Sequence, residues 1–136
     1  MKWGRFLAAG VCAGIVISIA SYIVSAGIQA VSPYNMLALG GIRGASDPMM
    51  LAFFAYPFVL GFAMAALYTI FKKSFSGNDE RREVRLGLAY WLVYSVPSAF
   101  VVFTSMDYPV AFEATNLIGT FIGFIAAAYV IVRLMK

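Results

Sequence analysis

The sequence predicts an all-α membrane protein in which four transmembrane helices form one bundle over residues 1–136. Hydrophobic residues make up 62% of the chain and charged residues only 12%, whereas a soluble domain is about half apolar and a quarter charged. Four stretches without charged residues are also long enough to cross a bilayer, and basic residues gather at their ends. This composition excludes a water-soluble globular protein, because a charge-poor surface would not stay solvated.

The four predicted spans cover residues 6–31, 48–71, 86–106 and 109–134, and the uncharged part of the last runs from Ala114 to Val132. A spanning helix needs about 20 apolar residues. Since backbone amides in hydrocarbon must be bonded within the structure, the spans should be helices. They lack the alternation of apolar and polar residues that is typical of a barrel. The first span also exceeds the apolar core of about 7–15 residues in a signal peptide, so we expect it to be retained.

Basic residues are distributed unequally between the two sides of the predicted bundle. Only Arg43 lies in the segment between the first and second spans. By the positive-inside rule, both termini are expected in the cytoplasm of a multi-pass protein of the cell (inner) membrane. The net charge of +4 therefore indicates topology, and we expect the lipid bilayer rather than nucleic acid as a partner. The nine basic residues on the cytoplasmic side are Lys2, Arg5, Lys72, Lys73, Arg81, Arg82, Arg85, Arg133 and Lys136.

The order of the spans suggests two helical hairpins. Short loops join the second span to the third and the third to the fourth, so neighbouring helices should pack antiparallel. Duplication of one hairpin is one interpretation, and the similar endings of unrelated membrane helices are the other. Residues that match at an offset of 61 are Pro48 with Pro109, Tyr68 with Tyr129, Ile70 with Ile131 and Lys72 with Arg133.

The two longer connections have different predicted roles. Residues 32–47 are too apolar for a free loop, so we expect this segment to lie along the outer interface or to dip into it. Residues 74–83 contain Gly77 followed by Asn78 and Asp79, which is typical of a turn and a helix start. Asn78 or Asp79 is expected to cap the third helix.

Small and polar residues form a stripe on the first helix and another on the fourth. Small residues let membrane helices approach closely, and polar groups hydrogen-bond across the contact. We therefore predict that these two helices pack face to face, with Gln29 near Glu113 and Asn116 at the outer end, and with Gly10 and Gly14 near Gly123 at the inner end. The alternative is a homodimer through one glycine stripe. The predicted helix-packing residues are Gly10, Gly14, Ser18, Gly119 and Gly123.

Pro57 and Pro97 lie in the middle of the second and third predicted spans. A proline inside a helix removes one backbone hydrogen bond and bends the helix. Kinks at matched depth would open a cavity between the two helices, lined by the hydroxyl groups of Tyr56 and Tyr94. The alternative is that the kinks only fit the packing.

Glu113 is the most informative single residue of the sequence. An ionisable group within a span is by default a functional-site hypothesis. It also lies in the first turn of its helix, where a carboxylate suits the helix dipole. Arg43 is the only cation expected on the same side, so the two interpretations are a structural ion pair or cap, and a carboxylate that couples to protons or cations.

The sequence carries no recognisable catalytic or metal site. It has no histidine, so a nucleophilic serine would lack its usual base. Cys12 cannot form an intrachain disulfide and lies among apolar residues, where a thiol is usually inert. Asp47 and Asp107 flank prolines and are typical of turns. We therefore expect no enzymatic activity, no metal and no cofactor.

Two functions fit these observations. The first is a non-enzymatic carrier or binder of a small or lipidic molecule, with a cavity near Pro57 and Pro97 and a polar mouth formed by Glu113, Asn116 and Gln29. A transport pathway would need a homodimer or larger assembly, because one copy has little room. The second is an accessory subunit that docks a larger membrane partner through its glycine stripes.

Overall fold

The computed structural model describes residues 3–75 and 77–136, and Lys2 lies outside them. The described chain is helical and contains no strand, which confirms the all-α prediction. Four helical segments are long and apolar enough to cross a membrane, and they indicate a membrane protein: Trp3–Val31, Met50–Phe71, Asp79–Ser105 and Val110–Leu134. The elements are α1 (Trp3–Val31), the 3₁₀ turn η1 (Met36–Ala38), α2 (Met50–Phe53), α3 (Tyr56–Phe71), α4 (Asp79–Ser105) and α5 (Val110–Leu134).

Helix α4 begins earlier than the predicted span, at Asp79 rather than at residue 86. Its first turns are charged and therefore extend beyond the apolar stretch that predicted the helix. The side chain of Asn78 accepts a hydrogen bond from the backbone amide of Arg81, and Asp79 lies in the first turn. Asn78 is thus the N-cap, which decides between the two residues that the sequence offered.

The prediction that Pro57 kinks one continuous helix is wrong. The second span is broken between Phe53 and Tyr56 into α2 and α3, and Pro57 lies in the first turn of α3. The missing amide hydrogen of proline is tolerated there, because the first amides of a helix have no partner within the helix. Pro97, in contrast, lies inside α4 as predicted.

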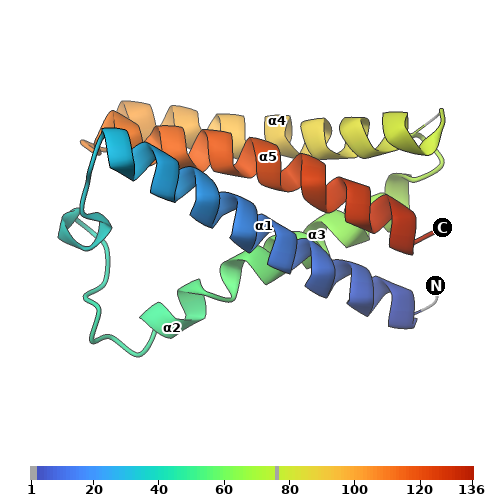
Figure 1. Cartoon of the computed structure of the whole chain (residues 1–136), viewed down its shortest axis with the longest axis horizontal. Helices are drawn as coiled ribbons and strands as arrows, with labels where there is room; N and C mark the ends of the chain where they lie inside the picture. Colours follow the sequence, from blue (N-terminus) through green and yellow to red (C-terminus); the bar gives the residue numbers. More distant parts are fainter. Residues whose placement is uncertain (1–2, 76) are drawn as a thin grey trace.

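The helices are arranged as an open wedge (Figure 1). One end of the molecule, the terminal end, holds both chain termini and the connection from α3 to α4. The opposite end, the loop end, holds residues 32–49 and 106–109. Helix α5 packs against α1 and α4, and α1 packs against α3, but α3 makes little contact with α4. Going from the terminal end to the loop end, α3 and α2 diverge from α4 and α5 (Figure 1).

The α1–α3 crossing depends on glycine on both helices. A Cβ at Gly61 would lie 2.7 Å from the amide nitrogen of Gly14, and closer still to the carbonyl oxygen of Gly10. The rings of Phe58 and Phe62 lie over Gly14 and Gly10. The predicted approach of Gly10 and Gly14 to Gly123 of the fourth span is therefore wrong. Helical periodicity defined their common face, but not the helix that this face meets.

Helix α5 forms the predicted contact with α1, which is the largest in the molecule. A Cβ at Gly119 would lie 3.5 Å from the Cα of Ser21, and one at Gly123 would lie 3.5 Å from the Cα of Ile17. On the other side of α5, Gly87 of α4 lies so close that a Cβ would be 2.7 Å from the Cα of Ile125. The two expected hairpins, α1 with α3 and α4 with α5, are both in contact. Their origin by duplication stays a prediction.

The two halves of the molecule are packed differently. The buried core lies in the half next to the terminal end. Beyond the core, two ion pairs connect α4 to the C-terminal residues: Arg133 Nε lies 2.9 Å from Glu83 Oε1, and Lys136 pairs with Asp79. The core consists of Ala9, Ala13, Ile17, Leu60, Met64, Ala65, Tyr68, Leu86, Phe124, Ala127, Ala128, Ile131 and Val132.

Candidate functional site

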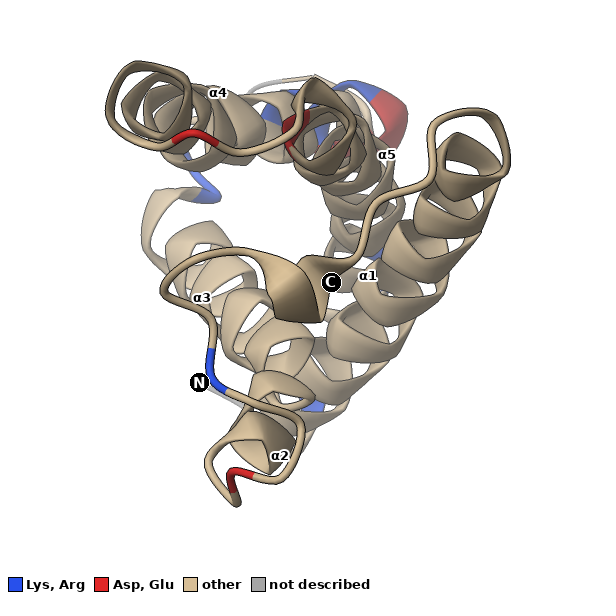
Figure 2. Ribbon diagram, turned by 90° about the vertical axis from the view of Figure 1, so that its left-hand side faces the viewer, with Lys and Arg blue, Asp and Glu red and all other residues tan. Residues whose placement is uncertain are grey.

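A cavity of about 740 Å³ occupies the half of the molecule next to the loop end. It lies where the solid core ends, and Ile17 and Leu60 belong to both. Viewed from the loop end, the long helices are arranged around a central gap in the backbone, and the connection that follows α1 crosses in front of this gap (Figure 2). The divergence of α2 and α3 from α4 and α5 therefore produces a hollow rather than a second packed layer.

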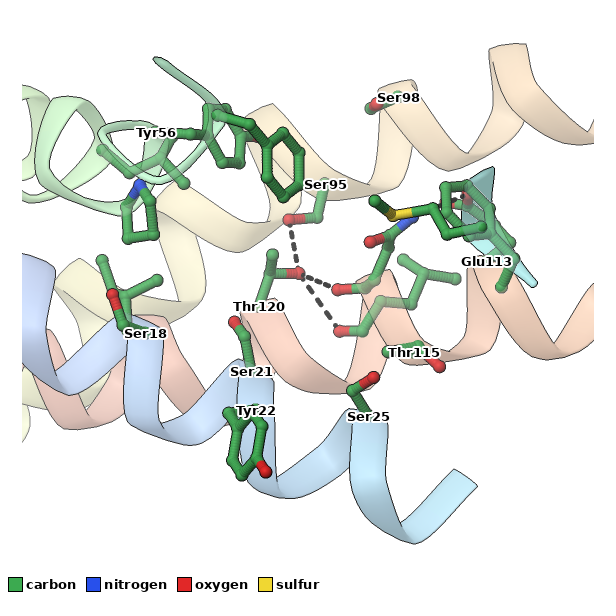
Figure 3. Close-up of a pocket in the computed structure, with 18 of the residues that line it drawn as sticks. Ser18, Ser21, Tyr22, Ser25, Tyr56, Ser95, Ser98, Glu113, Thr115 and Thr120 are labelled. Atoms are coloured by element: carbon green, nitrogen blue, oxygen red, sulfur yellow. Dashed lines mark hydrogen bonds between the residues drawn. The ribbon is translucent and has the colours of Figure 1, made fainter. Parts of the chain in front are cut away.

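The α1, α4 and α5 sides of the cavity carry hydroxyl groups. Ser95 is buried, and its Oγ donates a hydrogen bond to Thr120 Oγ1 at 2.8 Å. Thr120 in turn donates to the carbonyl oxygen of Asn116 at 2.6 Å (Figure 3). Seven further polar residues line the same walls: Ser18, Ser21, Ser25, Ser98, Glu113, Thr115 and Asn116.

The opposite wall is apolar and aromatic. Met50, Phe53 and Phe54 line it from α2 and the following break, and Leu60 lines it from α3. The break before Pro57 tilts α2 away from the other helices, so these side chains border the cavity instead of filling it.

Tyr56 and Tyr94 meet at the boundary between the two kinds of wall. Both line the cavity, and their hydroxyl groups are in hydrogen-bond contact. The tyrosine that precedes Pro57 and the one that lies three residues before Pro97 thus line one cavity, as predicted. Each carries an aromatic face and a polar tip, so the pair is suited to a ligand that has both characters.

The segment of residues 32–49 covers the loop end of the cavity. Tyr34, Met36 and Ile42 line the cavity, and the Tyr34 hydroxyl donates to Thr115 Oγ1 at 3.2 Å. The ring of Tyr34 packs edge-on against Phe112 at 5.7 Å between centroids. The segment therefore lies along the helices, as its apolar composition predicts.

Arg43 lies outside the cavity. Its guanidinium is 2.7 Å from Asp47 Oδ2, and this hydrogen bond holds the pKa of Asp47 below its usual value. The prediction that Arg43 pairs with Glu113 is therefore wrong. Because Asp47 is only four positions further along the same segment, it reaches the arginine without any helix packing.

Glu113 is buried in the wall of the cavity without a cationic partner. Only 4% of the residue is exposed. The Asn116 side-chain amide donates a hydrogen bond to Glu113 Oε2 at 3.5 Å. Within the described chain, Glu113 takes part in none of the ion pairs. The structural ion-pair interpretation of this residue is thus not met, although it does lie in the first turn of α5.

Gln29 does not belong to this site. Its side chain is exposed and donates to Ser25 Oγ at 3.1 Å, and it does not line the cavity. The predicted polar mouth is thus reduced to Glu113 and Asn116. Tyr34 and Thr115 also line the cavity but could not be predicted, because they come together only through the fold of the 32–49 segment. Ser95 and Ser98 line it as well, and their spacing of three residues could have indicated a shared helix face.

The fold and the cavity define a class: a four-helix protein suited to a membrane, packed solidly at one end and hollow at the other. No family model, no curated protein and no solved structure matches this chain. Among the described residues, no group of three or more His, Cys, Asp or Glu side chains could hold a metal ion.

Proposed function

We propose that this chain is a non-enzymatic membrane protein that binds or carries an amphipathic small or lipidic molecule. The observation that carries the proposal is the cavity of about 740 Å³ with hydroxyl groups on one wall and aromatic and aliphatic groups on the other. Ligand sites in proteins are typically hollows of about 300–1,000 Å³, mostly apolar, with a few placed polar groups. A polar head group would meet the hydroxyl groups, and an apolar tail would lie along α2.

The side of the cavity between α2 and α4 supports access from the bilayer. Phe53 and Tyr56 line the cavity and are 52% and 41% exposed, and Ser98 of α4 lines it and is also exposed. Since α3 and α4 make little contact, a tail of a bound molecule can extend between them into lipid.

The accessory-subunit alternative has less support. It rests on small-residue stripes that would dock a partner, but Gly10, Gly14, Gly119 and Gly123 are all buried within the described chain. The same burial removes the basis for a homodimer through a glycine stripe. A transporting assembly of several copies would therefore have to use other faces.

A matched pair of tryptophan substitutions tests the proposal. Ser98→Trp places a large ring in the opening of the cavity, where the serine is exposed and not packed. Val93→Trp places the same ring on the same helix, at a residue that is 78% exposed and does not line the cavity. Native mass spectrometry of gently extracted protein should detect bound amphiphile on the wild type and on Val93→Trp, but not on Ser98→Trp. Equal retention by both variants would contradict the proposal.

A further inference from the structure

The cavity combines one buried carboxyl group with an absence of positive charge. Glu113 is 96% removed from solvent, since only 4% of it is exposed. None of the residues that line the cavity, all of them within the described chain, is Lys or Arg. The nearest basic residue along the covering segment, Arg43, is exposed and paired with Asp47.

Burial of a carboxylate without a cation is costly. Removing such an ion from water costs several kcal/mol, and a single hydrogen bond to Asn116 at 3.5 Å offsets only part of this cost. The described residues that line the cavity supply no positive charge. A ligand that carries one would pair with Glu113 and complete the site.

Aromatic side chains reinforce the same preference. Phe112 precedes Glu113 in the chain and packs edge-on against Tyr34, and Phe53, Tyr56 and Tyr94 line the same cavity. The faces of aromatic rings attract cations, so a cavity with such walls suits an organic ammonium group. The hydroxyl groups of the cavity can accept hydrogen bonds from a primary ammonium, and Glu113 is the one charged residue among the described residues that line the cavity.

We propose that the molecule bound in this cavity carries an ammonium group, which is held at Glu113, on an apolar body that lies along α2. This inference rests on the proposed function and adds the charge of the ligand to it. The source is either an amine-bearing lipid or a free hydrophobic amine, since both present the same chemistry to the site.

Three fluorescent probes with one apolar body provide the test. Diphenylhexatriene is available with a trimethylammonium group, with no head group and with a propionate group. Trp91 serves as the reporter, because its Nε1 donates to the carbonyl oxygen of Leu117, which lines the cavity. The Trp3→Phe background leaves Trp91 as the only tryptophan of the two in the chain. Quenching of its emission is followed in micelles of dodecyl maltoside, whose head group carries no amine, as the mole fraction of each probe rises.

We expect saturable quenching by the cationic probe at a mole fraction about tenfold lower than for the neutral probe, a difference of ~1.4 kcal/mol. Glu113→Gln should abolish this preference, whereas Glu80→Gln, at an exposed position of the terminal end, should keep it. Ser98→Lys adds a cation at an exposed position of the cavity wall and leaves residue Glu113 unchanged. Because the added charge repels a cationic head group, Ser98→Lys should also abolish the preference, whereas the neutral Ser98→Gln should keep it.

The outcomes separate the two proposals. Equal saturable quenching by all three probes, or a preference for the anionic probe, would overturn the ammonium assignment and leave amphiphile binding in place. Quenching that never saturates with any probe would overturn both. Saturable cationic preference that is reduced by phosphatidylethanolamine added to the micelles assigns the amine to a lipid, and preference that this lipid does not reduce assigns it to a free amine.

Discussion

Gly61 is the residue on which the α1–α3 crossing depends most directly. We predict that Gly61→Ala destabilises the protein by about 1–3 kcal/mol or more, because the added Cβ would meet backbone atoms of Gly10 and Gly14 that cannot rotate away. Gly27→Ala is the matched control, since nothing lies within 4 Å of a Cβ there. It should be neutral or stabilising by about 0.5–1 kcal/mol, owing to the higher helix propensity of alanine. Equilibrium unfolding in mixed micelles, followed by circular dichroism, measures both.

The Glu83–Arg133 pair at the terminal end gives a second prediction at the residue scale. The Glu83 side chain is 7% exposed and the Arg133 side chain 43% exposed. Arg133→Gln leaves a buried carboxylate without this partner, so it should lower the free energy of unfolding clearly. Glu83→Gln leaves an arginine that water still solvates, so it should lower the free energy of unfolding less. Equal losses from the two variants would contradict this asymmetry.

At this scale the sequence predicts which residues share a helix face, but not the partner of that face. Gly10 and Gly14 do form one surface, as their spacing predicts, yet they meet α3. Gly61 and Gly87, which approach the backbone of a neighbouring helix most closely, have no second glycine three or four residues away that would mark a stripe. Glu113 is recognisable from its chemistry alone, whereas its lack of a cationic partner depends on where the fold places Arg43, which pairs with Asp47.

At the scale of elements, the start of α4 is determined by a cap rather than by hydropathy. The Asn78 side chain accepts a hydrogen bond from the Arg81 amide. Asn78→Ala should therefore cost about 0.5–2 kcal/mol, and Asn78→Asp should cost little because aspartate also caps. Hydrogen exchange of the first turns of α4 is the sharpest measurement, since fraying should be confined to residues 79–83. Unchanged protection in Asn78→Ala would show that tertiary contacts alone hold this end.

The break between α2 and α3 shows where element prediction from sequence stops. Hydropathy identifies one continuous span over residues 48–71, and a proline within it predicts a bend. The chain instead ends α2 at Phe53 and restarts at Tyr56. Both arrangements satisfy the constraint of Pro57, which lacks an amide hydrogen. The choice between them depends on what α2 packs against, and on the cavity side it packs against very little.

At the scale of the whole molecule, four helices follow from composition because bilayer thickness sets the length of an apolar segment. The division into a packed terminal half and a hollow loop half does not follow from it. It arises because small residues bring α1 against α3 and α5, whereas α2 makes few contacts with the other helices and leaves Phe53 and Phe54 exposed. The cavity thus depends on where close helix contacts occur along the chain and where they are missing.

The orientation of this asymmetric molecule is the last prediction. The terminal end carries Arg5, Lys72 and Arg133 with other basic residues, whereas Arg43 is the only Lys or Arg in residues 32–49 and 106–109. The positive-inside rule therefore directs the loop end, and with it the covered cavity, away from the cytoplasm.

Cysteine labelling tests this orientation, because Cys12 is the only cysteine of the chain. In a Cys12→Ala background, Ser46→Cys and Ser74→Cys place single thiols at exposed positions of opposite ends. A membrane-impermeant maleimide should label Ser46→Cys on intact cells, and Ser74→Cys only after permeabilisation. The reverse pattern would turn the molecule over, and an amphiphile would then enter the cavity from the cytoplasmic leaflet. Labelling of both thiols on intact cells would mean either that the second span does not cross the membrane or that the protein inserts in both orientations.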